Sequence, residues 1–324
     1  ASLESAFAQT YAPLENVISD VCSQDGAFEI IQSMAAAYRG PHTVIVNRNE
    51  RNIGLIGNLN KLYSLARGEL HFYHCDDDVS LPNRVEVMVD AWLRHGKAPM
   101  VLASAFQEMD LQGRDVAVRH PPANGILGLD CLSFLRSNNP VEAFSGSGAV
   151  LAYNRKVFDT FGPFTFTENV AEDWVMLVRA RLLGDLLAVP DVLLKYRLGG
   201  GLTTDFSRYH KIMLRHFTCV GAAMQQLSLD IETIRPRLSD DVYAAFKREA
   251  ESRADREERM VRLYSAPAFK DRLTAFRSLA DAKLFVQPKA LGLLTLALFP
   301  PAVSPRLMQA AYSLLSALKP KPRS

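Results

Sequence analysis

The chain has 324 residues, a net charge of +2 and a 48% share of hydrophobic residues, which is typical of a soluble globular protein with one or two domains. Its four cysteines are scattered and form no C-x-x-C pair, which argues against a disulfide framework and a thiolate zinc site. No apolar run reaches the length of a membrane span, and no signal-peptide pattern is present. We therefore expect a cytoplasmic protein that is neither secreted nor membrane-spanning.

The charge is distributed unevenly along the chain. Residues 234–324 hold 17 Lys and Arg against 9 Asp and Glu, so the preceding part is net acidic. Residues 284–324 have no acidic side chain and contain two apolar stretches broken by prolines. Two interpretations of this tail stay open: an amphipathic helix on the inner face of the cytoplasmic membrane, or packing against the protein's own core or a partner. Nucleic-acid binding is not expected, because the basic residues alternate with acids and few aromatics.

Short β-rich runs alternate with helical patterns over the first two hundred residues. This order predicts an α/β fold with a mostly parallel central sheet, whose carboxyl edge is where ligands bind. From about residue 205 the pattern becomes helical and charged, with acidic and basic residues at i, i+4 spacing. The expected strands are 14–19, 43–47, 69–75, 99–106 and 148–153, and the expected helices include 26–40 and 81–96.

Three consecutive carboxylates, Asp76–Asp78, follow the third expected strand. Carboxylates held by a rigid strand end are suitable ligands for a hard divalent cation, but an acidic triplet taken alone is more often a solvated turn. An EF-hand loop is excluded, because Leu81 stands where its glycine is required. A zinc site through His71, His74 and Cys75 is disfavoured, since the two histidines point to opposite faces of a strand.

The motifs around the triplet occur in a recognisable order. Before it come "AQTYAPLENVISDVCSQDG" and a set spaced as N-x-G-(x)5-N-(x)5-A-x-G, and after it comes "VAEDWVMLVRARLLGDLLAVPDVLLKYR". The spaced set consists of Asn52, Gly54, Asn60, Ala66 and Gly68. In this order, over roughly residues 3–204, the chain resembles the inverting nucleotide-sugar glycosyltransferases of family 2, which have the Rossmann-like GT-A fold.

The resemblance implies a GT-A domain over residues 1–204 and a helical region over 205–324. It also implies a nucleoside diphosphate sugar as donor, a polysaccharide or lipid-linked glycan as hydroxyl acceptor, and Mg²⁺ or Mn²⁺ as cofactor. Asp173, paired with Glu172, takes the position of the catalytic base. The metal ligands implied are Asp76, Asp77 and Asp78, and the donor-binding residues implied are Asp20, Asp25, Asn52, Gly54, Asn60, Asp76 and Arg197.

The chemistry of inverting transfer agrees with these assignments. A base must take the proton of the acceptor hydroxyl, and a cation must neutralise the leaving diphosphate. Each motif also has a purely structural interpretation when it is taken alone. Glu172 and Asp173 suit the positive end of a helix dipole, Asp20 suits a strand-end turn, and Asn52 with Gly54 suits a tight loop.

The sequence departs from the family pattern at several positions. Cys75 stands where the first aspartate of the usual D-A-D-D is expected, Val21 replaces a second carboxylate, and no histidine follows Tyr196–Arg197. The chain begins in an expected helix, where family members first have a central strand. We therefore expect either a fragment with two unpaired strand edges or another segment that fills the central position. These departures keep a non-catalytic nucleotide- or glycan-binding relative open as the alternative, and a glycoside hydrolase with paired carboxylates is a more distant one.

Overall fold

A computed structural model describes residues 1–281, except 123, 128–129, 138–140, 142–143, 145–146, 167–169 and 199–208. The chain divides into two compact units, one of residues 1–200 with 225–250 and one of residues 201–224 with 251–324. The predicted domain boundary after residue 204 and the basic tail fall outside the described residues, and both stay predictions.

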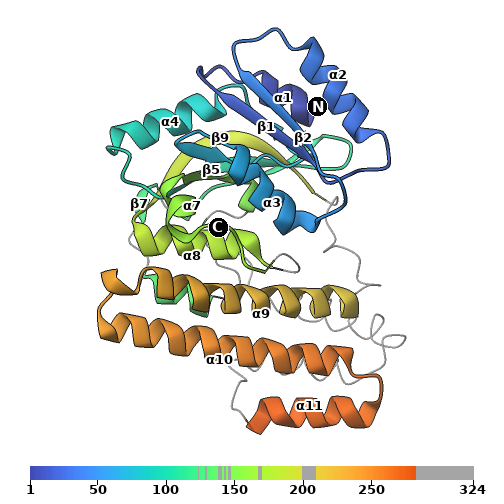
Figure 1. Ribbon diagram of the computed structural model, residues 1–324, viewed down its shortest axis with the longest axis vertical. Helices are drawn as coiled ribbons and strands as arrows, with labels where there is room; N and C mark the ends of the chain where they lie inside the picture. Colours follow the sequence, from blue (N-terminus) through green and yellow to red (C-terminus); the bar gives the residue numbers. More distant parts are fainter. Residues whose placement is uncertain are drawn as a thin grey trace, which may run out of the picture. The chain divides into compact units, whose positions relative to one another are not determined.

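The first unit begins with a small two-stranded layer. Strands β1 (Glu15–Asp20) and β2 (Thr43–Arg48) pair in parallel, with Glu15 opposite Thr43 and Asp20 opposite Arg48. Three helices accompany them: α1 (Ser2–Phe7), α2 (Ala27–Ala37) and α3 (Gly54–Leu65) (Figure 1). The chain therefore starts in a helix, as predicted. Gly54 opens α3 with a φ of 71°, a conformation that favours glycine.

Residues 1–55 of this layer contain no buried apolar side chain. Residues 1–55 are described throughout, and their buried side chains are all polar: Ser5, Gln9, Asp20 and His42. The first buried apolar side chain along the chain is that of Ile56. Strand β1 is hydrogen-bonded to β2 and to no other described strand, so its second edge is left without a sheet partner.

A larger sheet of seven strands forms the centre of the first unit. Its main path is β3-β8-β5-β9-β4, while β6 adds to β5 and β7 adds to β9. The strands are β3 (Leu70–Phe72), β4 (Val79–Ser80), β5 (Val101–Met109), β6 (Asp115–Arg119), β7 (Gly125–Leu127), β8 (Leu151–Asn154) and β9 (Leu186–Arg197).

The α/β class is confirmed. The two longest ladders, β1 with β2 and β5 with β9, run parallel, and the shorter ladders of the described sheets run antiparallel. In β9 the register shifts where Ser104 pairs with Val189 and Ala105 pairs with Val192. Pro190 lies in this irregularity, as expected for a residue that cannot donate a ladder hydrogen bond.

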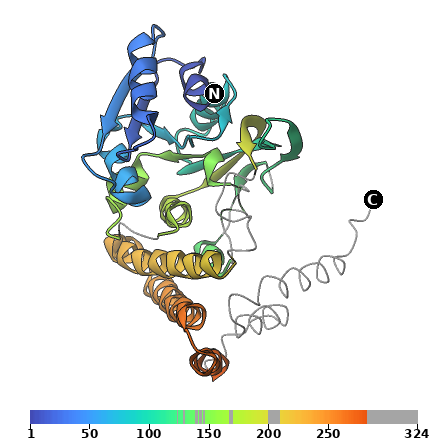
Figure 2. The same cartoon turned by 90° about the vertical axis from the view of Figure 1, so that its right-hand side faces the viewer.

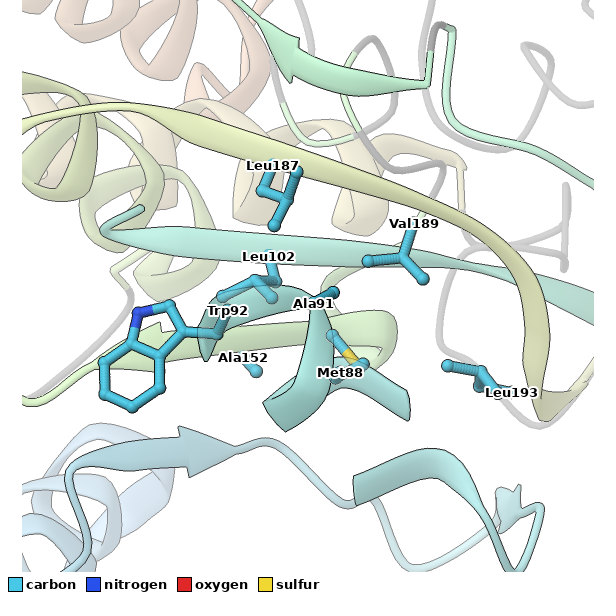
Figure 3. Packing of buried hydrophobic residues seen from close by; sticks show 8 residues of the cluster. All are labelled: Met88, Ala91, Trp92, Leu102, Ala152, Leu187, Val189 and Leu193. Carbon is cyan, nitrogen blue, oxygen red and sulfur yellow. The ribbon is translucent and has the colours of Figure 1, made fainter. Parts of the chain in front are cut away.

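Helix α4 (Arg84–Arg94) packs on one face of the sheet and produces the main core cluster of that face (Figure 3). Trp92 lies over the strands and donates its indole N–H to Pro99 O at 3.1 Å, so its one polar atom is satisfied. The cluster consists of Met88, Ala91, Trp92, Leu102, Ala152, Leu187, Val189 and Leu193.

Helix α8 (Glu172–Leu183) contacts β5, α5 (Cys131–Arg136) and α7 (Lys156–Phe161). Its side chain Arg179 is fully buried and donates to both carboxylate oxygens of Asp230, at 2.7 and 2.8 Å. A bidentate geometry of this kind satisfies a buried charge on both sides. Asp230 belongs to the part of α9 (Tyr209–Thr233) that is included in the first unit.

The second unit is helical among its described residues. It combines the first half of α9 with the second half of α10 (Asp240–Ser265) and α11 (Phe269–Asp281), drawn from yellow to red-orange in Figure 2. Its core is formed by Leu263, Tyr264 and Leu279, with Met213, Leu214 and Phe217 packed against them. No helix in the described part of the chain is long and apolar enough to span a membrane.

Candidate functional site

The acidic triplet lies in the loop between β3 and β4, and its three members differ in exposure. Asp76 and Asp77 are exposed, whereas Asp78 is only 1% exposed. Asp78 Oδ1 accepts a hydrogen bond from the backbone N–H of Arg197 at 3.0 Å, which fastens the loop to the end of β9. Asp78 Oδ2 is buried and has no hydrogen-bond partner among the described residues.

The electrostatics of the loop follow from this burial. Desolvation, with a smaller contribution from the charge of Asp77, raises the pKa of Asp78 to about 6. Although Cys75 is exposed overall, its thiol is desolvated and close to Asp78 and Asp77, which raises its pKa to about 12. Cys75 is therefore a neutral thiol at pH 7 and does not replace the negative charge of an aspartate there.

The buried Asp78 gives a test by pH. Its folded-state pKa of about 6 lies above the ordinary value of 3.8, so the folded state binds more protons between these two values. The free energy of unfolding is then expected to fall as pH rises from 4 to 6, by on the order of 2 kcal/mol. Asp78→Asn keeps an oxygen that accepts the backbone N–H of Arg197, and it is expected to abolish this fall in the free energy of unfolding. Urea denaturation of both proteins at pH 4, 5, 6 and 7 without divalent cations measures it, and parallel pH curves would contradict the assignment.

Arg197 holds the neighbouring backbone in place. Its side chain donates to Asp77 O at 3.0 Å and to the carbonyls of Asp110 and Leu111, both at 3.3 Å. These bonds fix the acidic loop against the turn between β5 and β6. The contact of Arg197 with a donor stays a prediction.

Asp20 ends β1 at the carboxyl edge of the small parallel layer and is 6% exposed. Its Oδ2 accepts the backbone N–H groups of Cys22 and Ser23, both at 3.0 Å, and lies 3.6 Å from Arg48 Nε. Burial acts to raise the pKa of Asp20, but the bonds from Ser23 and Cys22 and the charge of Arg48 outweigh it and lower the pKa. The carboxylate of Asp20 is thus kept ionised and points toward the backbone of the loop that follows β1.

Sequence reasoning missed a network of amide side chains that supports this strand end. Asn58 Nδ2 donates to Ser19 O at 3.0 Å, and Asn58 Oδ1 accepts from Ser19 Oγ at 2.6 Å and from Asn49 Nδ2 at 2.7 Å. Asn49 Nδ2 also donates to Asp20 O at 2.9 Å. The signal in the sequence was the large number of asparagines in "NRNERNIGLIGNLN". The hydrogen-bond partners of these asparagines cannot be assigned without the fold.

The other predicted donor-binding residues have local structural contacts. Asn52 Oδ1 accepts from Gly54 N at 2.8 Å, and Asp25 Oδ1 accepts from Ala27 N at 3.1 Å. Asn60 exchanges two hydrogen bonds with the backbone of Phe164, at 3.0 and 2.9 Å. Each of these contacts shapes a loop or joins two elements, and the donor-binding roles stay predictions.

Asp173 lies in the first turn of α8, where the helix dipole favours a negative charge. It is partly buried, and its Oδ1 accepts from Trp174 N at 2.8 Å. Desolvation raises its pKa in spite of that backbone hydrogen bond. The charges of Asp173 and Glu172 raise the pKa of the buried hydroxyls of Tyr73 and Tyr153, in addition to the larger effect of desolvation. The two acids therefore lie near these two tyrosines.

The acidic loop and the turn next to Asp173 adjoin two paired strands of the central sheet. Strands β3 and β8 are antiparallel, and Tyr73 N donates to Leu151 O at 3.2 Å just where β3 ends and β8 begins. The turn η1 (Gly148–Val150) precedes β8 directly, and a Cβ built on Gly148 would lie 3.1 Å from Asp173 Oδ2. The loop that follows β3 and the turn that contacts Asp173 are therefore neighbours.

Comparison with known proteins identifies the family. The model of the family described as "Glycosyl transferase family 2" matches residues 1–159. Residues 1–159 belong to glycosyl transferase family 2. The putative glycosyltransferase EpsE of Bacillus subtilis (strain 168) is 32% identical over 115 residues, which cover 35% of this chain and 40% of that protein. The chain thus spans less than half the length of this curated relative.

Two solved structures are similar to this chain. Residues 1–349 of TarS from S. aureus show a TM-score of 0.48 at 16% identity, covering 88% of this chain and 87% of that one. The mannosyltransferase PcManGT from Pyrobaculum calidifontis, solved with GDP-Man and Mn²⁺, shows a TM-score of 0.46 at 19% identity. That match covers 98% of this chain and 81% of that one.

The acidic loop of the family 2 domain has donors that suit a hard cation. Asp76 and Asp77 present exposed carboxylate oxygens, and the unpartnered Oδ2 of Asp78 lies in the same loop. Within the described residues, no three His, Cys, Asp or Glu side chains converge as a complete metal site. This donor set fits a cation such as Mg²⁺, which keeps several waters and is bound through one or two carboxylates together with substrate phosphates.

The close approach of Gly148 to Asp173 leads to a second test. An added Cβ would also lie 3.2 Å from Asp173 Cβ, an atom that a change of rotamer does not move. Gly148→Ala is expected to cost about 1–3 kcal/mol of unfolding free energy. Gly68→Ala is the matched control, because its Cβ would meet Leu70 O at an ordinary 3.5 Å. Equal midpoints of urea denaturation for the two variants would show that the Gly148 contact does not matter.

Proposed function

We propose that the chain is a metal-dependent inverting glycosyltransferase. It transfers a sugar from a nucleoside diphosphate donor to a hydroxyl of a polysaccharide or lipid-linked glycan. The observation that carries the proposal is that the loop with Asp76 and Asp77 follows β3, while the turn next to Asp173 precedes β8, the strand that pairs with β3. A transfer reaction of this kind needs both groups at one place.

The proposed reaction divides between the two groups. Asp76 and Asp77 would hold the cation, which supplies positive charge to the leaving diphosphate. Asp173 takes the proton of the acceptor hydroxyl as the hydroxyl oxygen attacks the anomeric carbon and the bond to the diphosphate breaks. Desolvation raises the pKa of Asp173, which makes its carboxylate a stronger base than an ordinary aspartate.

The direct experiment is a screen of nucleoside diphosphate sugars with Mn²⁺ or Mg²⁺, in which released nucleoside diphosphate is measured. We expect release with one class of donor, and loss of release when EDTA is added. Donor hydrolysis without an acceptor is measured in parallel, so that transfer is counted only when an added glycan increases the release. Release that is unaffected by EDTA would contradict the metal-dependent part of the proposal.

One observation favours a second candidate, a non-catalytic nucleotide-binding relative. Cys75 stands at the position of a family carboxylate and is a neutral thiol at pH 7, so the loop has one negative charge fewer. This candidate predicts metal-dependent binding of nucleoside diphosphates, measured by calorimetry, with no release from any donor sugar. Restoring the carboxylate with Cys75→Asp would then be expected to strengthen Mn²⁺ binding.

A further inference from the structure

Arg84, the first residue of α4, is one of the largest fully buried side chains of the protein, with 1% exposure. In the described part of the chain, the Nε atom of Arg84 has no hydrogen-bond partner. Burial lowers its pKa to about 10, so the guanidinium is still charged at neutral pH. The charge of Asp78 acts on this guanidinium without an ion pair being formed, so the burial of the charge is costly for stability.

The two terminal nitrogens of Arg84 bind on opposite sides of the candidate site. Nη1 donates to Ser80 Oγ at 3.0 Å, in the strand that follows the acidic loop. Nη2 donates to Ala149 O at 2.7 Å, in the turn η1 beside Gly148. A Cβ built on Gly148 would lie 3.1 Å from Asp173 Oδ2, so η1 is next to Asp173. The guanidinium of Arg84 is therefore bonded both to the strand after the acidic loop and to the turn next to Asp173.

The start of the acidic loop is attached to the same guanidinium through side chains. Ser80 Oγ is hydrogen-bonded with His74 Nδ1 at 3.0 Å, and His74 Nε2 with Ser2 Oγ at 2.9 Å. Ser2 Oγ donates to Cys75 O at 2.7 Å. The loop Asp76–Asp78 is therefore fixed at both of its ends by a continuous network that leads to Arg84. The positive charge also acts directly on Asp78 and Cys75.

We propose that Arg84 is a positioning residue that holds the acidic loop and the η1 turn in one fixed geometry. Its planar fork provides two donors at a set angle, which the single ammonium of a lysine does not reproduce. The consequence for transfer rests on the proposed function, whereas the coupling of the two segments does not. A group that orients metal ligands from behind typically changes metal affinity or activity by about 10–100-fold when it is replaced.

The test compares Arg84→Lys with Arg179→Lys as a matched control. Arg179 is equally buried, but it binds Asp230 and lies in α8. Amide hydrogen exchange is followed over residues 73–80 and 148–152. We expect faster exchange of both segments in Arg84→Lys, and no change of either segment in Arg179→Lys, even where the latter lowers the melting temperature. The Kd for Mn²⁺ alone is expected to rise by about 10–100-fold in Arg84→Lys and to stay unchanged in the control.

Ser80→Ala keeps the test decisive if Arg84→Lys does not fold. It removes the acceptor of Nη1 and the link to His74, and leaves the guanidinium in place. Faster exchange over residues 73–80 together with 148–152 is again the expected result. Faster exchange limited to one segment, or an equal effect of Arg179→Lys, overturns the proposal. If the wild-type protein binds no nucleoside diphosphate and releases none, the proposed function fails while the exchange result still decides the role of Arg84.

Discussion

Asp173→Asn is expected to lower the rate of sugar transfer by about 10²–10⁴-fold, the usual contribution of a general base. The amide keeps an oxygen to accept the Trp174 N–H, so the start of α8 is preserved. It also removes a carboxylate whose pKa is raised by desolvation, so the melting temperature is expected to stay equal or to rise. Nucleoside diphosphate release in the presence of an acceptor measures the loss.

The pH dependence of the same reaction gives an independent reading of Asp173. A base acts when it is deprotonated, and a raised pKa moves the rise of the rate to higher pH than an ordinary aspartate would give. We therefore expect kcat of the wild type to rise with pH on the acidic side of its pH profile, and we expect this rise to be absent in Asp173→Asn. Asp159→Asn, on the exposed part of α7, is the control and is expected to keep both the rate and this rise. Transfer at the wild-type rate by Asp173→Asn would rule out its role as base.

Asp76→Ala and Asp77→Ala are expected to weaken Mn²⁺ binding by at least about 100-fold, since even residues behind the ligands contribute 10–100-fold. Transfer is expected to fall with metal occupancy. Both side chains are exposed, so the melting temperature measured without metal is expected to be unchanged. Electron paramagnetic resonance of free Mn²⁺ measures the affinity directly.

The control for this prediction is Asp78→Asn in the same loop. Asp78 is committed to Arg197 N through one oxygen, so its replacement is expected to alter the pH dependence of stability more than the Mn²⁺ affinity. Equal Mn²⁺ affinities of wild type, Asp76→Ala and Asp77→Ala would remove this loop as the metal site. A loss seen only in Asp78→Asn would place the ligand at the buried oxygen instead.

The sequence predicted strands at β1, β2, β3, β5 and β8, and it missed β4, β6, β7 and β9, the last of which is the longest strand of the described sheets. Apolar runs such as "TVIVN" and the strand ending at Cys75 are long enough to show a period, and β2 and β3 lie within or next to them. Strands β4, β6 and β7 have two, five and three residues, and their existence depends on pairing with β9 and β5 rather than on local pattern. A tertiary contact of that kind leaves no periodic trace.

In the candidate site, too, some features could be predicted from the local sequence and others depend on the fold. Asp20, Asp173 and the triplet could be named as candidates because their residue types and order carry information, and their roles stay predictions. The difference in exposure between Asp77 and Asp78 could not be found, because adjacent residues in a loop have no fixed period of burial. Arg84 was missed because an arginine in the first turn of an amphipathic helix is normally a solvated surface residue. Only the fold shows that it lies beneath the loop.

The polar interior of residues 1–55 has a thermodynamic consequence for any ligand that contacts Asp20. A segment without buried apolar side chains is expected to open at a lower free energy than the central sheet, so we expect the fraction of molecules that hold Asp20 in place to be lower than the fraction that keep the central sheet. The apparent dissociation constant of such a ligand is then the intrinsic constant divided by that fraction. Measured affinity would therefore report two equilibria together, and conditions that order the first layer would tighten binding without any new contact to the ligand.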